Sequence, residues 1–241
     1  MKYDIHCHLT NKEYSNPNTI ITECEKNNIS IILNGLDYED NEKVLEFSKT
    51  YSNVHASLGM HPTNIFDSKI INQIIKNKDK IISIGEVGID YKEGVDETQL
   101  INFRKIIQLA EKLSKPLIIH SRNAEKEVIN ELISIQVPAI LHCFTGKKKL
   151  LKEALNNPNI YFSIPANIKY SQQFQDLVKE IQIEKLLCET DSPYLWKECM
   201  NTPLNVIYSY EKISQLKGIS IPECEDLIEK TVKTVFKLSN I

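Results

Sequence analysis

The sequence lacks the features that mark membrane, secreted and DNA-coating proteins. No apolar stretch is long enough to cross a bilayer, and Asp4 and His6 stand where a signal peptide needs an apolar core. The six cysteines show no paired, zinc-finger-like spacing, so we expect a protein of the reducing cytoplasm. Only two arginines, Arg104 and Arg122, occur, and the net charge of -3 argues against a broad electrostatic footprint for duplex DNA.

Breaks between domains are also absent. No linker, low-complexity tract or block of charge divides the 241 residues, so we expect a single domain over 1–241. The hydrophobic fraction of 41% and the charged fraction of 25% are ordinary for a protein that buries a full core. Nothing in the sequence indicates an obligate protein partner.

Short β-branched runs alternate with longer segments that carry apolar residues at helical spacing. The strand-like runs lie at 3–7, 30–34, 54–58, 81–84, 117–120, 139–142, 160–163 and 185–188. A helical pattern follows each; one of them is capped by Asp96 and stopped by Pro116, and patterns at 205–216 and 222–238 close the chain. The alternation predicts an α/β fold with a parallel sheet. Eight repeats favour a closed (β/α)8 TIM barrel, and a doubly wound open sheet is the alternative.

Histidines and carboxylates gather at the predicted strand ends, where barrels of this kind carry out chemistry. Five of the six histidines lie at or just beyond such ends, whereas His55 lies within its strand and is interpreted as structural. His6 and His8 are two residues apart in a strand, so both leave on the same face. The residues gathered at strand ends are His6, His8, His61, Glu86, His120, His142 and Asp191. Core packing does not explain this distribution, whereas a shared site does.

Several of these residues also have a structural interpretation. Glu86 directly follows an apolar run, and a carboxylate at that depth needs a cation or a proton. A histidine after an apolar run is usually a packed side chain, but His120 and His142 occupy equivalent places in successive units. Asp191 precedes a Ser-Pro pair and could cap a helix instead. Cys7 should face the surrounding helices and is left outside the site.

Six motifs follow in order along nearly the whole chain. They are HCHL at 6–9, GMHP at 59–62, GEVGIDY at 85–91, PLIIHSR at 116–122, HCFTG at 142–146 and ETDSPYL at 189–195. Together they resemble the TatD family, metal-dependent deoxyribonucleases of the amidohydrolase superfamily. The set ends with Asn201-Thr202-Pro203 near the last barrel helix.

The resemblance implies a centre with two divalent metal ions. In the family pattern Glu86 bridges the two ions, and further residues complete each set of ligands. The first set is His6, His8, Glu86 and Asp191, and the second is Glu86, His120 and His142. Two cations about 3.5–4 Å apart can share a water and lower its pKa. Nitrogen and oxygen ligands without thiolate permit Mg²⁺, Mn²⁺ or Zn²⁺.

The same pattern suggests roles in catalysis and in substrate binding. We expect Asp191 and Glu86 to be the catalytic carboxylates, with Asp191 as general base. His61 and Arg122 are expected to hold phosphate oxygens, and Tyr91 to stack on an unpaired base. A structural salt bridge is the alternative for Arg122, and simple packing is the alternative for Tyr91.

One departure from the family concerns substrate contacts. Many members carry an arginine-rich stretch just before the last motif, where this chain has Glu198, Cys199 and Met200. Phosphate binding would then fall to Arg122, His61 and nearby lysines.

Three functions remain open on the sequence alone. The first is hydrolysis of DNA, as a 3′-to-5′ exonuclease on single-stranded or frayed ends. The second is hydrolysis of another ester, lactone or amide, as elsewhere in the superfamily. Glu86 stands where several of those relatives use a lysine, which favours the nuclease. The third is a metal-binding scaffold without activity, which the intact ligand set disfavours.

Overall fold

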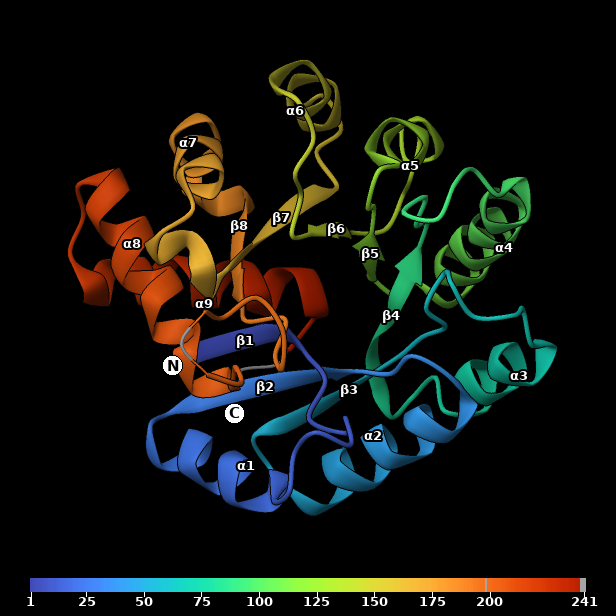
Figure 1. Ribbon diagram of the computed structural model, residues 1–241, viewed down its shortest axis with the longest axis horizontal. Helices are drawn as coiled ribbons and strands as arrows, with labels where there is room; N and C mark the ends of the chain where they lie inside the picture. The colour runs from blue at the N-terminus through green and yellow to red at the C-terminus, as the bar shows by residue number, and fades with distance from the viewer. Residues whose placement is uncertain (198, 239–241) are drawn as a thin grey trace.

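The computed structural model describes residues 1–197 and 199–238, and eight parallel strands in these residues form one sheet in chain order (Figure 1). The strands are β1 (Lys2–Cys7), β2 (Ile29–Asn34), β3 (Val54–Leu58), β4 (Ile81–Gly88), β5 (Leu117–His120), β6 (Ala139–His142), β7 (Ile160–Pro165) and β8 (Leu186–Glu189). The sheet curls round until β8 lies beside β1, with the helices outside it (Figure 1). The predicted (β/α)8 barrel is confirmed.

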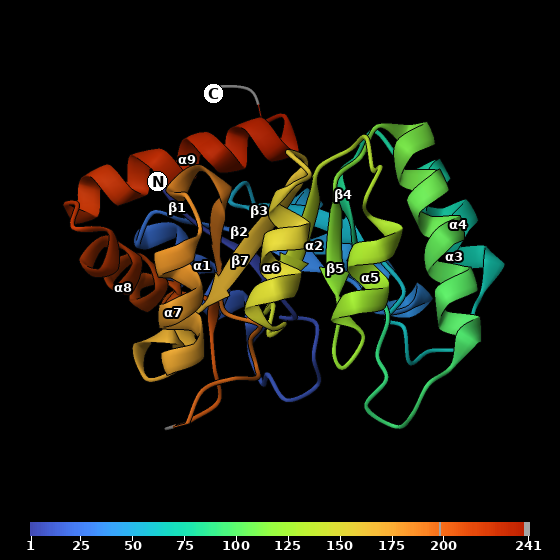
Figure 2. The same cartoon turned by 90° about the horizontal axis from the view of Figure 1, so that it is seen from above.

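The outer layer consists of nine α-helices and three 3₁₀ turns within the described residues. The α-helices are α1 (Pro17–Lys26), α2 (Tyr38–Thr50), α3 (Ser68–Lys76), α4 (Glu97–Leu113), α5 (Glu125–Glu131), α6 (Lys148–Leu155), α7 (Gln172–Glu180), α8 (Ile207–Lys217) and α9 (Ile221–Phe236). The 3₁₀ turns are η1 (Ala166–Lys169), η2 (Ile183–Lys185) and η3 (Pro203–Val206). None of these helices combines the length and the apolar character that a bilayer span requires. Helix α9 crosses the end of the barrel where the strands begin (Figure 2).

The predicted strands agree with the observed ones to within a few residues, and one difference matters for the site. Strand β4 continues to Gly88, so Glu86 lies inside the strand rather than beyond it. Two glycines permit this. A Cβ on Gly59 would lie 2.4 Å from the backbone of Glu86, and a Cβ on Gly88 would lie 2.0 Å from the carbonyl oxygen of His120. Only a hydrogen at these positions lets the three neighbouring strands approach so closely.

The barrel is closed by the segment that follows β8. Ser192 forms an isolated parallel bridge with Cys7, and its carbonyl oxygen accepts the His8 N–H at 2.8 Å. The Asp191 N–H donates to the His6 carbonyl oxygen at 2.9 Å. These main-chain bonds set Asp191 directly beside the end of β1, although the two lie at opposite ends of the sequence.

A buried carboxylate also links β1 to the segment that closes the barrel. Asp4 is fully buried, and its carboxylate accepts the Thr190 N–H at 2.9 Å and the Thr190 hydroxyl at 2.5 Å. Burial raises the pKa of Asp4 well above its ordinary value, against the lowering effect of these hydrogen bonds. Asp4 therefore joins β1 to β8 and takes no part in the cluster at the barrel mouth.

Candidate metal centre

The first part of the centre surrounds one oxygen of Glu86. Nε2 of His6 and Nε2 of His8 lie 3.1 Å apart, and they lie 3.4 and 3.3 Å from Oε2 of Glu86. Oδ1 of Asp191 lies 3.5 and 3.6 Å from the same two nitrogens. On the far side of its ring, His8 Nδ1 lies 2.9 Å from the carbonyl oxygen of Asn34. A carbonyl can only accept, so the neutral ring carries its proton there and turns the Nε2 lone pair to the centre. We call this group, His6, His8 and Asp191, the first lobe.

The second lobe, His120 and His142, surrounds the other oxygen of Glu86. Nδ1 of His120 lies 2.8 Å and Nε2 of His142 lies 3.0 Å from Oε1, and these nitrogens are 3.1 Å apart. His61 approaches the same oxygen with Nε2 at 3.7 Å, while its Nδ1 lies 2.7 Å from the Thr63 hydroxyl. Glu86 is buried and divides its two oxygens between the two lobes. This is the arrangement that a bridging carboxylate requires.

Asp90 orients the second lobe from one side. Its Oδ2 lies 3.1 Å from Nε2 of His120, which leaves Nδ1 of that ring for the centre. The same carboxylate accepts from Nη2 of Arg122 at 2.5 Å and from Nε at 3.0 Å. Burial would raise the pKa of Asp90, but the Arg122 guanidinium lowers it to about 2. Arg122 thus positions Asp90, which in turn contacts the candidate ligand His120. The side chain of Arg122 remains 49% exposed.

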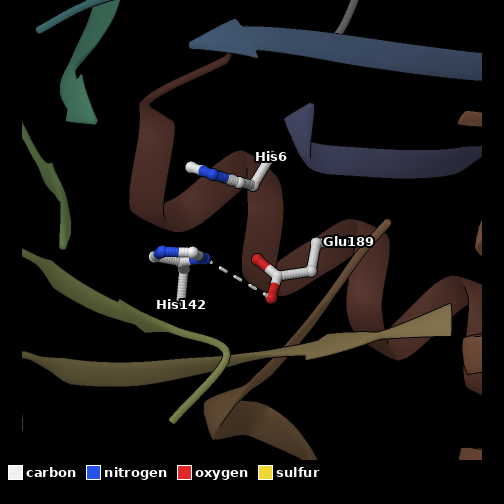
Figure 3. Close-up of side chains that lie close together, drawn as sticks. All are labelled: His6, His142 and Glu189. Atoms are coloured by element: carbon white, nitrogen blue, oxygen red, sulfur yellow. Dashed lines mark ion pairs between the residues drawn. The ribbon is translucent and has the colours of Figure 1, made fainter. Parts of the chain in front are cut away.

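Glu189 supports the second lobe from the other side. Its Oε1 lies 3.8 Å from Nδ1 of His142, and its carboxylate points beside the stacked rings of His6 and His142 (Figure 3). The carboxylate is fully buried and accepts the Cys143 N–H at 2.9 Å and the Ser163 hydroxyl at 2.5 Å. Protein donors therefore fix an anion near Nδ1 of His142, the ring nitrogen that does not face the centre.

The spacing of the atoms tests whether metal ions fit. Ligand atoms that bind one ion at about 2.0–2.2 Å are separated by about 3.3–3.6 Å in a tetrahedral arrangement, and by about 2.8–3.0 Å between neighbours in an octahedral one. The first lobe and Oε2 of Glu86 show separations of 3.1–3.6 Å. The second lobe and Oε1 show 2.8–3.1 Å. Both groups lie within about 0.2 Å of these spacings, so each is compatible with a shared cation.

The carboxylates of the centre are held in their charged form. Burial would raise the pKa of Glu86, but the neighbouring imidazoles, His142 foremost, hold it well below its ordinary value. Burial would likewise raise the pKa of Asp191, and its contacts with His6 and His8 lower it instead. Both side chains can therefore act as anionic ligands at neutral pH.

The pKa values of the imidazoles shift in different directions. Burial would lower the pKa of His8, but its contacts with Asp191 and Glu86 outweigh burial and raise it to about 10. The pKa of His142 is also raised well above its ordinary value, by Glu86 and Glu189 against the effect of burial. Burial lowers the pKa of His61 to about 4, so this ring is neutral at pH 7. Without metal, protons carry part of the positive charge that the carboxylates demand.

The other expected residues lie around this centre. Tyr91 is partly buried against the core, and its N–H donates to the carbonyl oxygen of Arg122 at 2.9 Å. Cys7 is buried away from the cluster, with its thiol against the carbonyl oxygen of Ile32. Asp191 opens a turn, since its carbonyl oxygen accepts the Tyr194 N–H at 2.9 Å; among the described residues no helix begins next to it. The helix-cap interpretation of Asp191 is wrong.

Asp90 and Glu189 are not among the site residues expected from the sequence. Both stand inside the recognised motifs. Asp90 follows Ile89 just beyond β4, and Glu189 follows Cys188 at the end of β8. A charged side chain at a buried strand end was the signal that singled out Glu86, and it applied equally to these two. Of the residues just before the last motif, Met200 is exposed, and Glu198 lies outside the described residues.

Comparisons with known proteins identify a family for the chain. A family model described as TatD related DNase matches residues 3–237. A protein of Methanocaldococcus jannaschii, named as a metal-dependent hydrolase, is 33% identical over 246 residues that cover 98% of each chain. The human deoxyribonuclease TATDN3 is 32% identical over 260 residues, which cover 98% of this chain and 93% of the relative. The crystal structure of YJJV, a TatD homolog from Escherichia coli, matches with a TM-score of 0.90 at 20% identity, over 99% of this chain and 98% of that one.

Proposed function

The chain belongs to the TatD family of metal-dependent hydrolases, and on that basis we propose that it hydrolyses phosphodiester bonds of DNA as a 3′-to-5′ exonuclease on single-stranded or frayed ends. The observation that carries the proposal is the carboxylate of Glu86, shared between two pairs of histidines at the mouth of the barrel. The name of the human relative, a deoxyribonuclease, supports the choice of substrate.

Two divalent cations, Mg²⁺, Mn²⁺ or Zn²⁺, would be held by the two lobes with Glu86 between them. When bound, they would polarise a phosphoryl oxygen and acidify a water. The residues that would hold them are His6, His8, Asp191, Glu86, His120 and His142. Asp90 orients His120 from behind, Asn34 orients His8, and Glu189 places its charge 3.8 Å from Nδ1 of His142.

Asp191 is the residue that accepts a proton from the attacking water. Its side chain is 16% exposed, compared with 4% for Glu86, so it is the carboxylate of the pair that meets the open mouth. Its low pKa keeps it ionised, and its place in a turn rather than a strand leaves Oδ1 at the edge of the cluster. Glu86, enclosed by both lobes, would serve as a ligand to both cations.

His61 and Arg122 are proposed to contact the substrate phosphate. His61 is neutral at pH 7 and can offer an N–H without repelling a cation. Arg122 holds Asp90 with one edge of its guanidinium and keeps about half of its side chain in solvent, where a phosphate can approach. Tyr91, on the segment hydrogen-bonded to Arg122, would lie against the attached base.

A single-strand digestion tests the proposal. With Mg²⁺ or Mn²⁺, a 5′-labelled oligodeoxynucleotide should shorten stepwise, EDTA should stop the reaction, and a phosphorothioate at the 3′ end should block it. His120→Ala should abolish shortening, and His55→Ala is the matched control, because His55 lies outside the cluster. Bound metal without shortening of DNA, together with hydrolysis of a lactone or an amide, would refute the nuclease assignment.

A further inference from the structure

Three aromatic rings and two lysines gather on the segments that follow β7 and β8 and at the start of α8, apart from the candidate metal ligands. Trp196 stacks on Tyr208 with ring centroids 5.1 Å apart and planes 23° apart, and Tyr170 lies 5.6 Å from Trp196. Nζ of Lys169 lies 4.3 Å from the Tyr208 ring and 5.5 Å from the Trp196 ring. Nζ of Lys197 lies 4.6 Å from the Tyr170 ring. We call these five residues the rim cluster.

The rim cluster lies on the same face of the barrel as the metal centre. Lys169 ends η1, which directly follows β7, and Trp196 stands five residues beyond Asp191 in the segment that follows β8. That segment extends from the end of the barrel opposite α9, together with the segments that follow β1 and β4 (Figure 2). Five residues of chain span at most about 17 Å, which bounds the separation of Trp196 from Asp191.

The segment that carries Trp196 is held in place. The Tyr170 hydroxyl donates to the Leu195 carbonyl oxygen at 3.3 Å and accepts the Lys197 N–H at 3.1 Å. The side-chain amide of Asn201 donates to two carbonyl oxygens of the same segment, at 2.9 and 2.7 Å. A ligand that binds the rings therefore meets a preformed surface and does not have to order a loop.

The composition of the rim cluster selects its ligand. The rings of Tyr170, Trp196 and Tyr208 are partly exposed, and Lys169 and Lys197 are exposed. Among residues 1–197 and 199–238, neither ammonium group pairs with a carboxylate. Rings flanked by cations fit a ligand that combines a flat π-face with negative charge. An apolar peptide does not combine these two features. A nucleotide has both, but a duplex hides the faces of its bases within the stack.

We propose that the rim cluster binds an unpaired base and its phosphate in single-stranded DNA whose 3′ end lies at the metal centre. The inference rests on the proposed nuclease function and extends it to the part of the substrate that is not cleaved. At about 3.4 Å per stacked nucleotide, a span of 17 Å is covered by about five nucleotides. An octanucleotide reaches both places at once.

The fluorescence of Trp196, the single tryptophan of the chain, reports occupancy directly. Titration of the full chain with an oligothymidylate octamer, in EDTA to prevent hydrolysis, should quench this fluorescence in a saturable way. An abasic octamer with the same number of phosphates, and a blunt duplex, should leave it within about a tenth of its starting value. Equal quenching by the abasic octamer, or none by oligothymidylate, would overturn the inference.

Variants of Trp196 distinguish loss of base stacking from loss of the folded structure. Trp196→Ala should weaken binding of a labelled octamer, measured by anisotropy, by about 5- to 100-fold, and should raise KM rather than lower kcat. Trp196→Phe keeps a flat ring and should stay within about 3-fold of wild type. Tyr51→Ala is the matched control, because Tyr51 lies just beyond α2 against Phe47. Equal effects of Ala and Phe at position 196 would contradict a stacking role.

A second variant tests the cations if Trp196→Ala proves unstable. Lys169→Gln should lower the slope of log K against log salt by about 0.7, the share of one phosphate contact on a single strand. Lys185→Gln is its control, since Nζ of Lys185 makes a similar contact, 4.3 Å from the Tyr161 ring, and Lys185 lies directly before β8. An unchanged slope for Lys169→Gln would count against the rim cluster.

The two proposals fail in different ways. Stepwise shortening of DNA without a change in Trp196 fluorescence refutes DNA binding by the rim cluster and leaves the proposed nuclease activity standing. Quenching by oligothymidylate without shortening, in protein shown to contain metal, refutes the nuclease and leaves the rim cluster as a site for single strands.

Discussion

The two lobes of the metal centre are supported in different ways. In the first lobe, His8 is oriented by the neutral carbonyl oxygen of Asn34, and Asp191 is set beside β1 by main-chain hydrogen bonds. In the second lobe, His120 and His142 are each backed by a buried carboxylate, Asp90 and Glu189. A carboxylate raises the basicity of the imidazole in front of it more than a carbonyl does. The supports of His120 and His142 are therefore side chains that a single substitution can remove, whereas the supports of His8 and Asp191 are main-chain groups.

Glu86 contacts both lobes, one with each carboxylate oxygen, so its loss should have the largest effect. Glu86→Gln should lower kcat by about 10³-fold or more, because binding of metal ions supplies several kcal/mol of transition-state stabilisation. Metal stoichiometry, measured by elemental analysis after dialysis, should fall from two to one or fewer per chain. A variant that keeps two ions and full activity would contradict the bridging role.

Removal of the proposed base should separate chemistry from metal binding. Asp191→Asn should reduce kcat by about 10²- to 10⁴-fold, the range of general base catalysis, while at least one metal ion stays bound. The test is single-turnover digestion of a labelled strand with metal content measured on the same sample. Activity like that of the wild type would remove the base role from Asp191.

The supporting carboxylates should affect the second lobe selectively. Glu189→Gln and Asp90→Asn should each weaken the binding of one of the two Mn²⁺ ions by about 10- to 100-fold, as loss of such partners does in other metal sites. Isothermal titration calorimetry with Mn²⁺ should resolve one site with weakened affinity and one with unchanged affinity. Equal weakening of both ions would show that the lobes are not supported independently.

Metal binding should become tighter as pH rises. The pKa of His8 in the metal-free protein is about 10, so near pH 7 an incoming ion must displace the proton from this ring. Each proton released contributes about tenfold in apparent affinity per pH unit. Calorimetry in buffers of different ionisation enthalpy measures the number of protons released. Apparent affinity that stays constant from pH 6 to 8 would contradict proton displacement.

The raised pKa of His8 also makes the stability of the metal-free protein depend on pH. A folded pKa of about 10 lies above the value of about 6.5 expected for an unfolded chain. The resulting stabilisation is complete below pH 6.5 and is lost as pH rises towards 10. The melting temperature of EDTA-treated protein should therefore decline over this range, and saturating metal should flatten the decline.

The smallest effect is expected at Arg122, which acts on the second lobe through Asp90. Arg122→Ala should raise KM for DNA about 3- to 10-fold, the effect of one exposed phosphate contact, while both metal ions remain bound. Arg104→Ala is the matched control, because Arg104 pairs with Glu131 on the outer helices. An unchanged KM would leave Arg122 only its contact with Asp90.

Much of the fold could be predicted because its signals are local. Apolar alternation and helical spacing depend on neighbours within one or two turns, so the eight strands were placed to within a few residues. The convergence of His6, Glu86 and His142 also followed, since the strands of a parallel barrel all end on one face. The Asp96 cap is local too, and its side chain accepts the Thr98 N–H at 2.9 Å.

Partners across the barrel could not be predicted in the same way. That Asp90 would face His120 and Arg122, or that Asp4 would hold Thr190, depends on which strands are neighbours and on their register. The rim cluster depends on three separate segments meeting after β7, after β8 and at the start of α8. Spacing along the chain carries none of this information.

The order of strands and helices, and the kinds of atom available to bind metal, follow from the amino-acid sequence alone, because they reflect local periodicity and side-chain chemistry. The division of Glu86 between two lobes, and the choice of which carboxylates bind and which only support, arise when the strands close into a barrel. Closure sets distances of 2.8–3.5 Å between side chains of residues up to 185 positions apart, and at that range geometry rather than composition decides what each charge does.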